Sequence, residues 1–170
     1  MRPGIDEMYR RFFPTIREKC ARMLKDRSEA QDVAQDTFER LCRAGPRGRD
    51  LEQVTAWIYR TSTRLAIDRM RWGEARAPHD GDGRAADASE IDLAGPGVEE
   101  AVVSRHELVS LAQAVPRQEL ELAILARVDR LTQREIAEVT GVSDRHVRRL
   151  LTRFDARLEQ WRRLGGYEDD

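Results

Sequence analysis

The sequence has 170 residues, of which 40% are hydrophobic and 36% charged, and its formal net charge is −1. This length and composition favour two small helical domains over one thick, strongly apolar sandwich. No stretch approaches the ~20 apolar residues of a membrane span, and residues 1–13 lack the apolar run of a signal peptide. We therefore expect a soluble, cytoplasmic protein without membrane insertion.

Helical periodicity dominates the first 72 residues, and no alternating strand pattern is evident. Apolar residues at spacings of three and four predict a first helix over residues 5–24. Ser28, with Gln31 three residues later, predicts a capping box that opens a second helix. The sequence GPRG at 45–48 predicts the end of that helix, and a third helix is expected over roughly 51–72.

Residues 73–97 differ in composition from both flanks. They are rich in Gly, Ala, Asp and Pro and poor in large apolar residues, so they cannot bury enough surface to offset their ordering entropy. The stretch 73–100 holds eight acidic and two basic residues, a local charge of −6. We predict a flexible acidic linker at 73–97, between a three-helix-type domain at 1–72 and a second domain at 98–170. The expected fold is all-α.

Helical patterns resume at about residue 98 and continue to the end of the second domain. Pro116 is predicted at the first position of its second helix. Thr132 with Glu135 predicts a capping box for a short helix, and Ser143 is predicted to cap a last helix that reaches about residue 164. Residues 143–163 contain seven arginines and three acidic residues, a local charge of +4.

Residues 132–151, TQREIAEVTGVSDRHVRRLL, predict a helix-turn-helix. Ala137 is small where two helices approach closely, and Gly141 permits a positive φ at the turn. Apolar residues stand at spacings that pack the two helices together, and they are Ile136, Val142, Val147 and Leu150. The alternative is a plain helical hairpin with a solvated basic face.

The second helix of this motif carries the candidate DNA-binding side chains. A helix of this shape fits the major groove, where arginine can read guanine edges. The candidates are Ser143, Arg145, His146, Arg148, Arg149 and Arg153. Arg153 and Arg157, further along, suit phosphate or solvent. Asp144 either accepts from a cytosine amino group or favours the helix N-terminus.

The first domain carries two further polar faces. The second helix presents Asp32, Gln35, Asp36 and Glu39 opposite its apolar stripe, a face that could also be merely solvated. The third helix carries Arg60, Arg64, Asp68, Arg69 and Arg71, interspersed with Trp57, Tyr59 and Trp72. Arginine beside aromatic rings suits single-stranded nucleic acid, although Trp57 could equally be a core residue.

Segments in both halves of the chain resemble a known protein family. Residues 29–41 (EAQDVAQDTFERL) and 56–72 (AWIYRTSTRLAIDRMRW) resemble domain 2 of the extracytoplasmic-function sigma factors of bacterial RNA polymerase. Residues 115–158 resemble their domain 4. The order, the spacing and the acidic linker all agree, and the resemblance covers nearly the whole chain apart from the linker and the extreme termini.

The resemblance implies a role for each face. Domain 2 would dock on the β′ clamp helices of core polymerase through Asp32, Gln35 and Asp36, with Glu39 on the same face. The third helix and the loop before it, about 44–55, would recognise and open the minus-10 element. Domain 4 would read the minus-35 element and contact the β flap, and the linker would imitate nucleic acid in the polymerase channel. An anti-sigma factor is expected as a further partner, and the free protein is expected to be a monomer.

Three departures from the family pattern fall in these segments. Thr61, Ser62, Thr63 and Arg64 stand where an Ile-Ala-Arg-Asn run is frequent. The sequence Asp-Arg-His at 144–146 stands where a Gly-Thr pair is frequent, and Asp36 replaces a frequent glutamate. The first two departures lie in the segments that would read DNA.

The sequence leaves two alternatives to a sigma factor and argues against an enzyme. A stand-alone helix-turn-helix regulator would explain only the C-terminal half, and a sigma-like decoy would bind polymerase or an anti-sigma factor without directing transcription. An enzyme is not expected, because His79, His106 and His146 are scattered and no nucleophile, phosphate-loop or metal motif is present. Cys20 and Cys42 lack the spacing of a zinc site, so neither cofactor nor metal is predicted.

Overall fold

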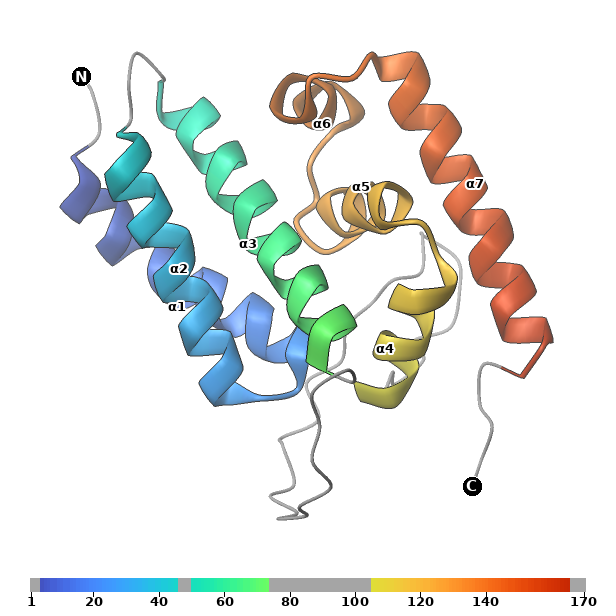
Figure 1. Ribbon diagram of the computed structural model, residues 1–170. Coiled ribbons are helices and arrows are strands. Elements are labelled where there is room, and N and C mark those ends of the chain that lie inside the picture. The colour runs from blue at the N-terminus through green and yellow to red at the C-terminus, as the bar shows by residue number, and fades with distance from the viewer. Residues whose placement is uncertain (1–3, 46–49, 74–104, 166–170) are drawn as a thin grey trace.

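The computed structural model describes residues 4–45, 50–73 and 105–165, and every regular element within them is an α-helix. The expected all-α class is therefore confirmed for this part of the chain. Apart from Gly73, the predicted linker at 73–97 lies outside the described residues. In chain order (Figure 1) the helices are α1 (Ile5–Leu24), α2 (Arg27–Ala44), α3 (Leu51–Gly73), α4 (Arg105–Ala114), α5 (Arg117–Arg127), α6 (Gln133–Thr140) and α7 (Asp144–Arg163).

Helices α1, α2 and α3 form an N-terminal bundle around large apolar side chains. Each helix contributes one fully buried stripe, as the periodicity predicts. Met8, Ile16, Val33 and Ile58 are at most 1% exposed. Trp57 is half-buried and packs against this core, which agrees with the core interpretation of its ring.

The predicted cap of α2 is wrong by two positions. Lys25 adopts a left-handed conformation with φ 52°, and this turn brings Asp26 to the N-cap, where its carboxylate accepts from the backbone N–H of Glu29. Ser28 therefore lies exposed inside the first turn. Aspartate and serine cap about equally well, so the tight turn at Lys25 decides between them.

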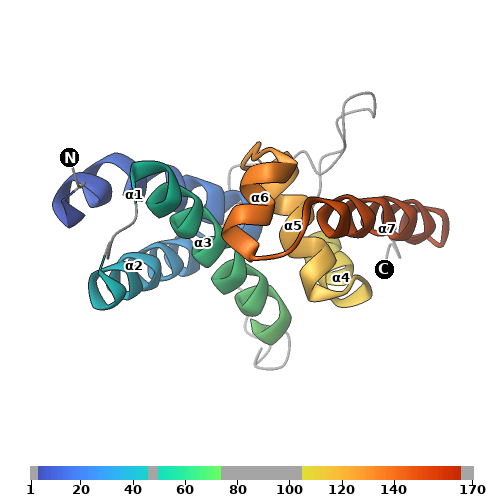
Figure 2. The ribbon, with the colours of Figure 1, turned by 90° about the horizontal axis from the view of Figure 1, so that it is seen from above.

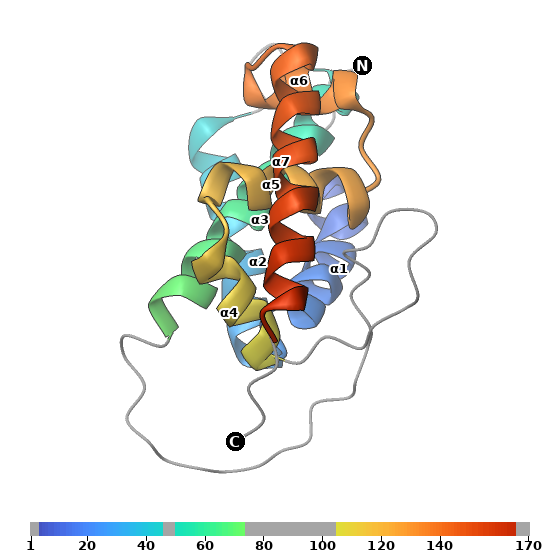
Figure 3. The same ribbon diagram turned by 90° about the vertical axis from the view of Figure 1, so that its right-hand side faces the viewer.

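Helices α4 to α7 form a C-terminal bundle centred on α5. Leu122 and Leu125 of α5 pack with Ile136, Val147 and Leu150, the apolar residues of the predicted helix-turn-helix. Pro116 is the N-cap of α5 and not its first residue, a correction of one position. In Figure 3, α7 lies on the outer side of the molecule, with the N-terminal bundle behind it.

The two bundles pack against each other along α3. Helix α3 contacts α4, α5 and α6, and α5 in turn contacts α7. Figures 1 and 2 show α3 between the α1/α2 pair and the C-terminal helices. Met23 and Met70 face Leu111, Leu120 and Ile124 across a small apolar gap. This apolar seam joins the N-terminal core to side chains of α4 and α5, while the helix-turn-helix residues form a second buried cluster.

The turn between α6 and α7 has the chemistry that the sequence predicts. Thr132 and Glu135 form a reciprocal capping box, in which the Glu135 carboxylate accepts from the backbone N–H of Thr132 at 2.6 Å. Gly141 has φ 73°, and Ser143 caps α7 by accepting from the N–H of His146. Hydrogen bonds from Thr132 hold the pKa of Glu135 below its usual value.

Replacing Thr132 by alanine should lower the free energy of unfolding by about 1 kcal/mol, because the N-cap acceptor is lost. The difference from wild type should shrink as the pH falls from the unfolded-state pKa of about 4.3 through the lower folded-state pKa, below which Glu135 is protonated in both states. This sign follows because a lowered pKa stabilises the fold fully above the unfolded-state value, and the stabilisation is lost as the folded carboxylate takes up its proton. Urea unfolding at several pH values measures both effects.

Thr152→Ala is the matched control for this prediction. Thr152 is exposed on α7 and its hydroxyl donates only to the carbonyl of Arg148 one turn earlier. Removing it should change stability little. Equal losses for the two variants would show that the capping box does not stabilise this motif.

Candidate nucleic-acid interface

Helix α7 presents an open basic face. Arg145, Arg148, Arg149 and Arg153 are exposed, and His146 is half-exposed beside them. The Arg149 guanidinium lies 2.8 Å from the Nδ1 atom of His146. The Arg148 guanidinium makes a long contact of 3.5 Å with the side-chain oxygen of Gln133. Among the described residues no carboxylate pairs with these four arginines. Their guanidinium groups can therefore accept phosphate or base edges without breaking an ion pair.

The arginines further along α7 play a different part. Arg157 pairs with the buried carboxylate of Glu119 at 3.0 Å, which ties α7 to α5. Arg127 of α5 pairs with Asp155 and lies over the ring of the fully buried Phe154. These contacts help to orient α7, whose N-terminal half buries Val147 and Leu150 and presents its arginines to solvent. Arg157, which was expected to contact phosphate or solvent, is half exposed and also holds this ion pair.

Helix α2 carries the predicted polymerase-binding face as an exposed row. Asp32, Gln35 and Glu39 are exposed and Asp36 is half-buried. Opposite them, Val33, Ala34, Thr37 and Phe38 are buried. Glu39 pairs with Arg43 at 3.0 Å within the same helix. The face is accessible while the two bundles are packed together.

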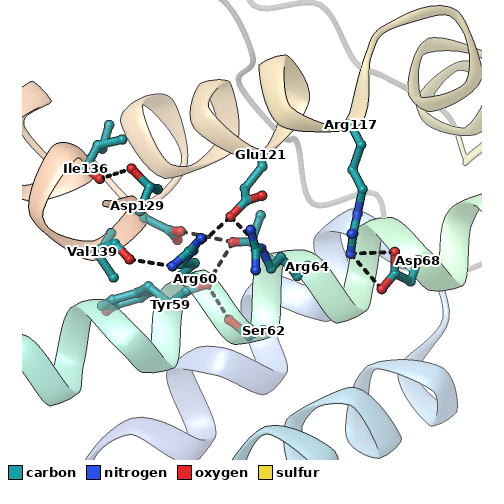
Figure 4. Close-up of polar contacts among 12 residues, drawn as sticks. Tyr59, Arg60, Ser62, Arg64, Asp68, Arg117, Glu121, Asp129, Ile136 and Val139 are labelled. Carbon is teal, nitrogen blue, oxygen red and sulfur yellow. Dashed lines mark hydrogen bonds and ion pairs between the residues drawn. The ribbon is translucent and has the colours of Figure 1, made fainter. Parts of the chain in front are cut away.

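The arginines of α3, in contrast, are held by the C-terminal bundle. Arg60 donates to the Glu121 carboxylate at 3.1 Å and to the carbonyl oxygen of Val139 at 2.6 Å. Arg64 donates to the same Glu121 oxygen at 2.8 Å. Figure 4 shows both guanidinium groups turned toward Glu121, which is only 4% exposed. The predicted minus-10 residues are therefore engaged with protein.

Two more of the predicted α3 residues join the same interface. Arg71 donates to the carbonyl oxygens of Ala112 and Val115 at 3.0 and 2.8 Å, at the C-terminal end of α4. A cation is favourable at that end of a helix. Asp68 pairs with Arg117 at 2.7 Å (Figure 4). Arg69 is exposed. The structure thus brings four of the five predicted residues against the second bundle.

A buried ion pair links the bundles at the middle of α3. The Lys19 ammonium lies 2.5 Å from Asp129, and both side chains are 2% exposed. Lys19 also donates to the Thr63 hydroxyl at 2.6 Å and to the carbonyl oxygen of Tyr59 at 3.3 Å. Burial raises the pKa of Asp129, and the Lys19 charge and hydrogen bonds from Lys19 and Thr63 oppose that rise.

This ion pair explains part of the departure at 61–64. Ser62 and Thr63 are fully buried. Thr63 accepts from Lys19, so an arginine in its place would set a second buried cation beside the first, which is costly without another carboxylate. Lys19 was not among the predicted residues. The available signal was its position three residues after the buried Ile16, on the apolar face of α1.

The described residues offer little for metal or nucleophilic chemistry. They contain no cluster of three or more His, Cys, Asp and Glu side chains suited to a metal ion. Cys20 and Cys42 are both free. Burial raises the pKa of Cys20 to about 12, so it stays a thiol. No helix in the described part of the chain is long and apolar enough to cross a membrane.

Comparison with protein families agrees with this geometry. Residues 8–75, which include α2 and α3, match the model of sigma-70 region 2. Residues 116–162, which include α5 and α6, match the model of a homeodomain-like domain. No curated protein matches the chain.

The helical fold and these matches fit a DNA-binding regulator of transcription, the class of protein to which sigma factors belong. The two matches in this order fit a sigma factor of the extracytoplasmic-function type, with its regions 2 and 4.

Replacing Asp129 by asparagine should lower the free energy of unfolding by about 3 kcal/mol, because Lys19 keeps its charge and loses its carboxylate. Glu138→Gln is the control, since Glu138 pairs only with Arg134 on the exposed face of α6. It should cost less than about 0.5 kcal/mol. Urea unfolding gives both values. Equal effects would mean that the buried ion pair adds nothing to stability.

Proposed function

We propose that the protein is an RNA polymerase sigma factor that binds core polymerase and directs initiation at promoters with defined minus-10 and minus-35 elements. The observation that supports this best is the combination of two arginine-rich helices in one chain. Helix α7 carries an open arginine face on a helix-turn-helix, and α3 carries a second arginine row within the sigma-70 region 2 match. A stand-alone helix-turn-helix regulator needs only α7, so it leaves the arginine row of α3 without a role.

The minus-35 element is the proposed ligand of α7. Arg145, His146, Arg148 and Arg149 occupy its first two turns, the part of a recognition helix that enters the major groove. Ser143 caps this helix, so its hydroxyl lies at the same end. Arg153, one turn later, suits a backbone phosphate.

The minus-10 element is the proposed ligand of α3. Arg60, Arg64, Asp68, Arg69 and Arg71 follow this helix, with Trp72 73% exposed near its end. An exposed ring beside arginines can stack on an unpaired base. Ser62 and Thr63 are buried in this structure, so the proposal assigns the contacts to the charged residues and the exposed Trp72.

Core polymerase is the proposed partner of α2. Asp32, Gln35, Asp36 and Glu39 form an acidic and amide row that suits a basic helical surface such as the β′ clamp helices. Contact of the second domain with the β flap and inhibition by an anti-sigma factor are proposed from the family alone. A monomeric free state, action in the cytoplasm, and domains at 1–72 and 98–170 with a linker at 73–97 are proposed on the sequence pattern described above.

Run-off transcription tests the proposal. Core polymerase from the source organism is supplied with a pool of genomic promoters, with and without the protein. Discrete new transcripts that begin downstream of a shared pair of elements would establish a sigma factor. Core binding without transcripts would favour a decoy. Absence of core binding would favour a stand-alone regulator.

Replacing Arg149 by alanine should lower promoter-specific transcription about tenfold, as expected for loss of one base or phosphate contact worth ~1–3 kcal/mol. Affinity for core polymerase should stay unchanged, because α2 and α3 are untouched. The control is Arg163→Ala at the far end of the same helix, where Arg163 pairs with Glu159. Equal loss of transcription and core binding would contradict the minus-35 role.

Replacing Asp32 and Gln35 together by alanine should weaken binding to core polymerase about tenfold or more, because a charged and an amide contact are both lost. Thr15→Ala with Glu18→Ala on α1 has the same spacing and exposure and should leave affinity unchanged. Fluorescence anisotropy of labelled protein titrated with core measures both. Unchanged affinity of the Asp32/Gln35 double variant would mean that this face of α2 is only solvated and does not contact core polymerase.

A further inference from the structure

We propose that His146 is a positioning residue for Arg149, and that the oriented Arg149 selects guanine at one position of the DNA that α7 reads. The inference rests on the proposed function and deepens it, because it concerns the base that the same helix recognises. It is carried by one short contact between the two side chains and by the looser hold on Arg148, their neighbour on the exposed face.

The contact between Arg149 and His146 defines the chemical state of the histidine ring. The Nη2 atom of Arg149 lies 2.8 Å from the Nδ1 atom of His146. A guanidinium group has donors and no acceptor, so Nδ1 must accept and the ring proton must lie on Nε2. The imidazole is therefore neutral in this contact, and it orients Arg149 without cancelling the positive charge.

The backbone beneath the contact is held at its cap and along its buried side. The backbone N–H of His146 donates to the hydroxyl of Ser143, the N-cap of α7, at 3.3 Å. Val147 and Leu150, which alternate with His146 and Arg149 along the helix, lie in the buried cluster of the helix-turn-helix. The position of α7 is thus set by packing, and the side-chain contact then sets where the guanidinium points.

A complete edge of the Arg149 guanidinium stays free for DNA. The five N–H bonds of this group form two edges, each with two parallel bonds, and one bond remains at a corner. Because Nη2 contributes one bond to each edge, the bond given to His146 interrupts one edge and leaves the other whole. Two parallel N–H bonds match the O6 and N7 atoms of guanine in the major groove. Arg149 can therefore contact His146 and a guanine at the same time.

Arg148 is held more loosely, which suits it to phosphate. Its guanidinium meets the side-chain oxygen of Gln133 at 3.5 Å, at the long end of hydrogen-bond distances. Gln133 belongs to α6, which packs beside the N-terminal end of α7 (Figures 1 and 3). A phosphate contact needs a charge within reach and no fixed edge. Two neighbouring arginines therefore have different tasks, Arg149 at a base and Arg148 at the backbone.

A neutral acceptor suits this face better than a carboxylate would. Arg145, Arg149 and Arg153 follow one another at intervals of four residues, so like charges adjoin along α7. A carboxylate would relieve that repulsion, but it would also repel DNA phosphates and compete with guanine for the guanidinium. His146 lies in the segment 144–146 that departs from the family pattern, so we expect this base preference to be specific to the chain.

The test is selection of bound DNA from a library of random-sequence duplexes, with the full chain bound to core polymerase and again without it. The wild type should require guanine at one position of the selected sequence. Arg149→Ala should relax that position about tenfold or more. His146→Ala should relax the same position about threefold, because the guanidinium loses its fixed orientation. His146→Gln should restore the preference, since a glutamine carbonyl can also accept from Arg149.

Three further variants separate orientation from charge. His146→Lys adds a cation without an acceptor, so affinity for all DNA should rise while the guanine position is relaxed. Arg148→Ala should lower affinity for all sequences alike and reduce the slope of log affinity against log salt by about 1. Arg163→Ala is the control. It removes an arginine that pairs with Glu159 at the far end of α7, and it should change neither base preference nor slope.

A spectroscopic readout checks the contact in the full chain without DNA. Nitrogen NMR of the His146 ring should show an unprotonated, hydrogen-bonded Nδ1 in the wild type, and this resonance should shift in Arg149→Ala. An unchanged resonance in Arg149→Ala would show that the two side chains are not in contact, which overturns the proposal.

The selection separates failure of this inference from failure of the proposed function. A selected sequence whose guanine survives Arg149→Ala or His146→Ala would overturn the inference and leave the sigma factor standing. Retention of guanine in His146→Lys would do the same, because the histidine would then act through charge. Failure to select any common sequence, with or without core polymerase, would reject the proposed function and the inference with it.

Discussion

A lysine ammonium that is 2% exposed needs a full set of partners, and the way Lys19 obtains them organises the whole molecule. Two partners, Thr63 and the carbonyl of Tyr59, come from α3 in the same bundle. The third, Asp129, comes from the turn after α5, 110 residues away in sequence. One charge therefore fixes the register of α1 on α3 and the position of the C-terminal bundle on both.

The local structure could be predicted from sequence because it depends on neighbours. The capping box of Thr132 and Glu135, the left-handed Gly141 and the cap at Ser143 all use residues within four positions of each other. The one wrong cap, Ser28, shows the limit of such rules. Asp26 and Ser28 both cap helices well and lie two residues apart. The left-handed conformation of Lys25 places Asp26 at the N-cap.

The contacts between the bundles could not be predicted in the same way. An arginine row on a helix looks alike in sequence whether it faces phosphate or a carboxylate, and Arg64 meets Glu121 across 57 residues. A signal existed on the other side of the contact. Glu121 interrupts a run of apolar residues in α5 and its side chain is 4% exposed, and a buried carboxylate calls for a cation. The exposure of the arginines on α7, in contrast, follows from helical spacing alone and could be predicted; their role in binding DNA stays a prediction.

The trio of Lys19, Thr63 and Asp129 has an evolutionary consequence. Its members lie in both bundles, so the two cannot be exchanged independently between relatives. In a chimaera whose second domain came from a protein without a carboxylate at position 129, Lys19 would be buried without its ion-pair partner. We expect the three positions to covary across homologous chains, with arginine at 63 found where 19 is not lysine. The ion pair between Lys19 and Asp129 therefore limits how far either domain can evolve or be replaced without the other.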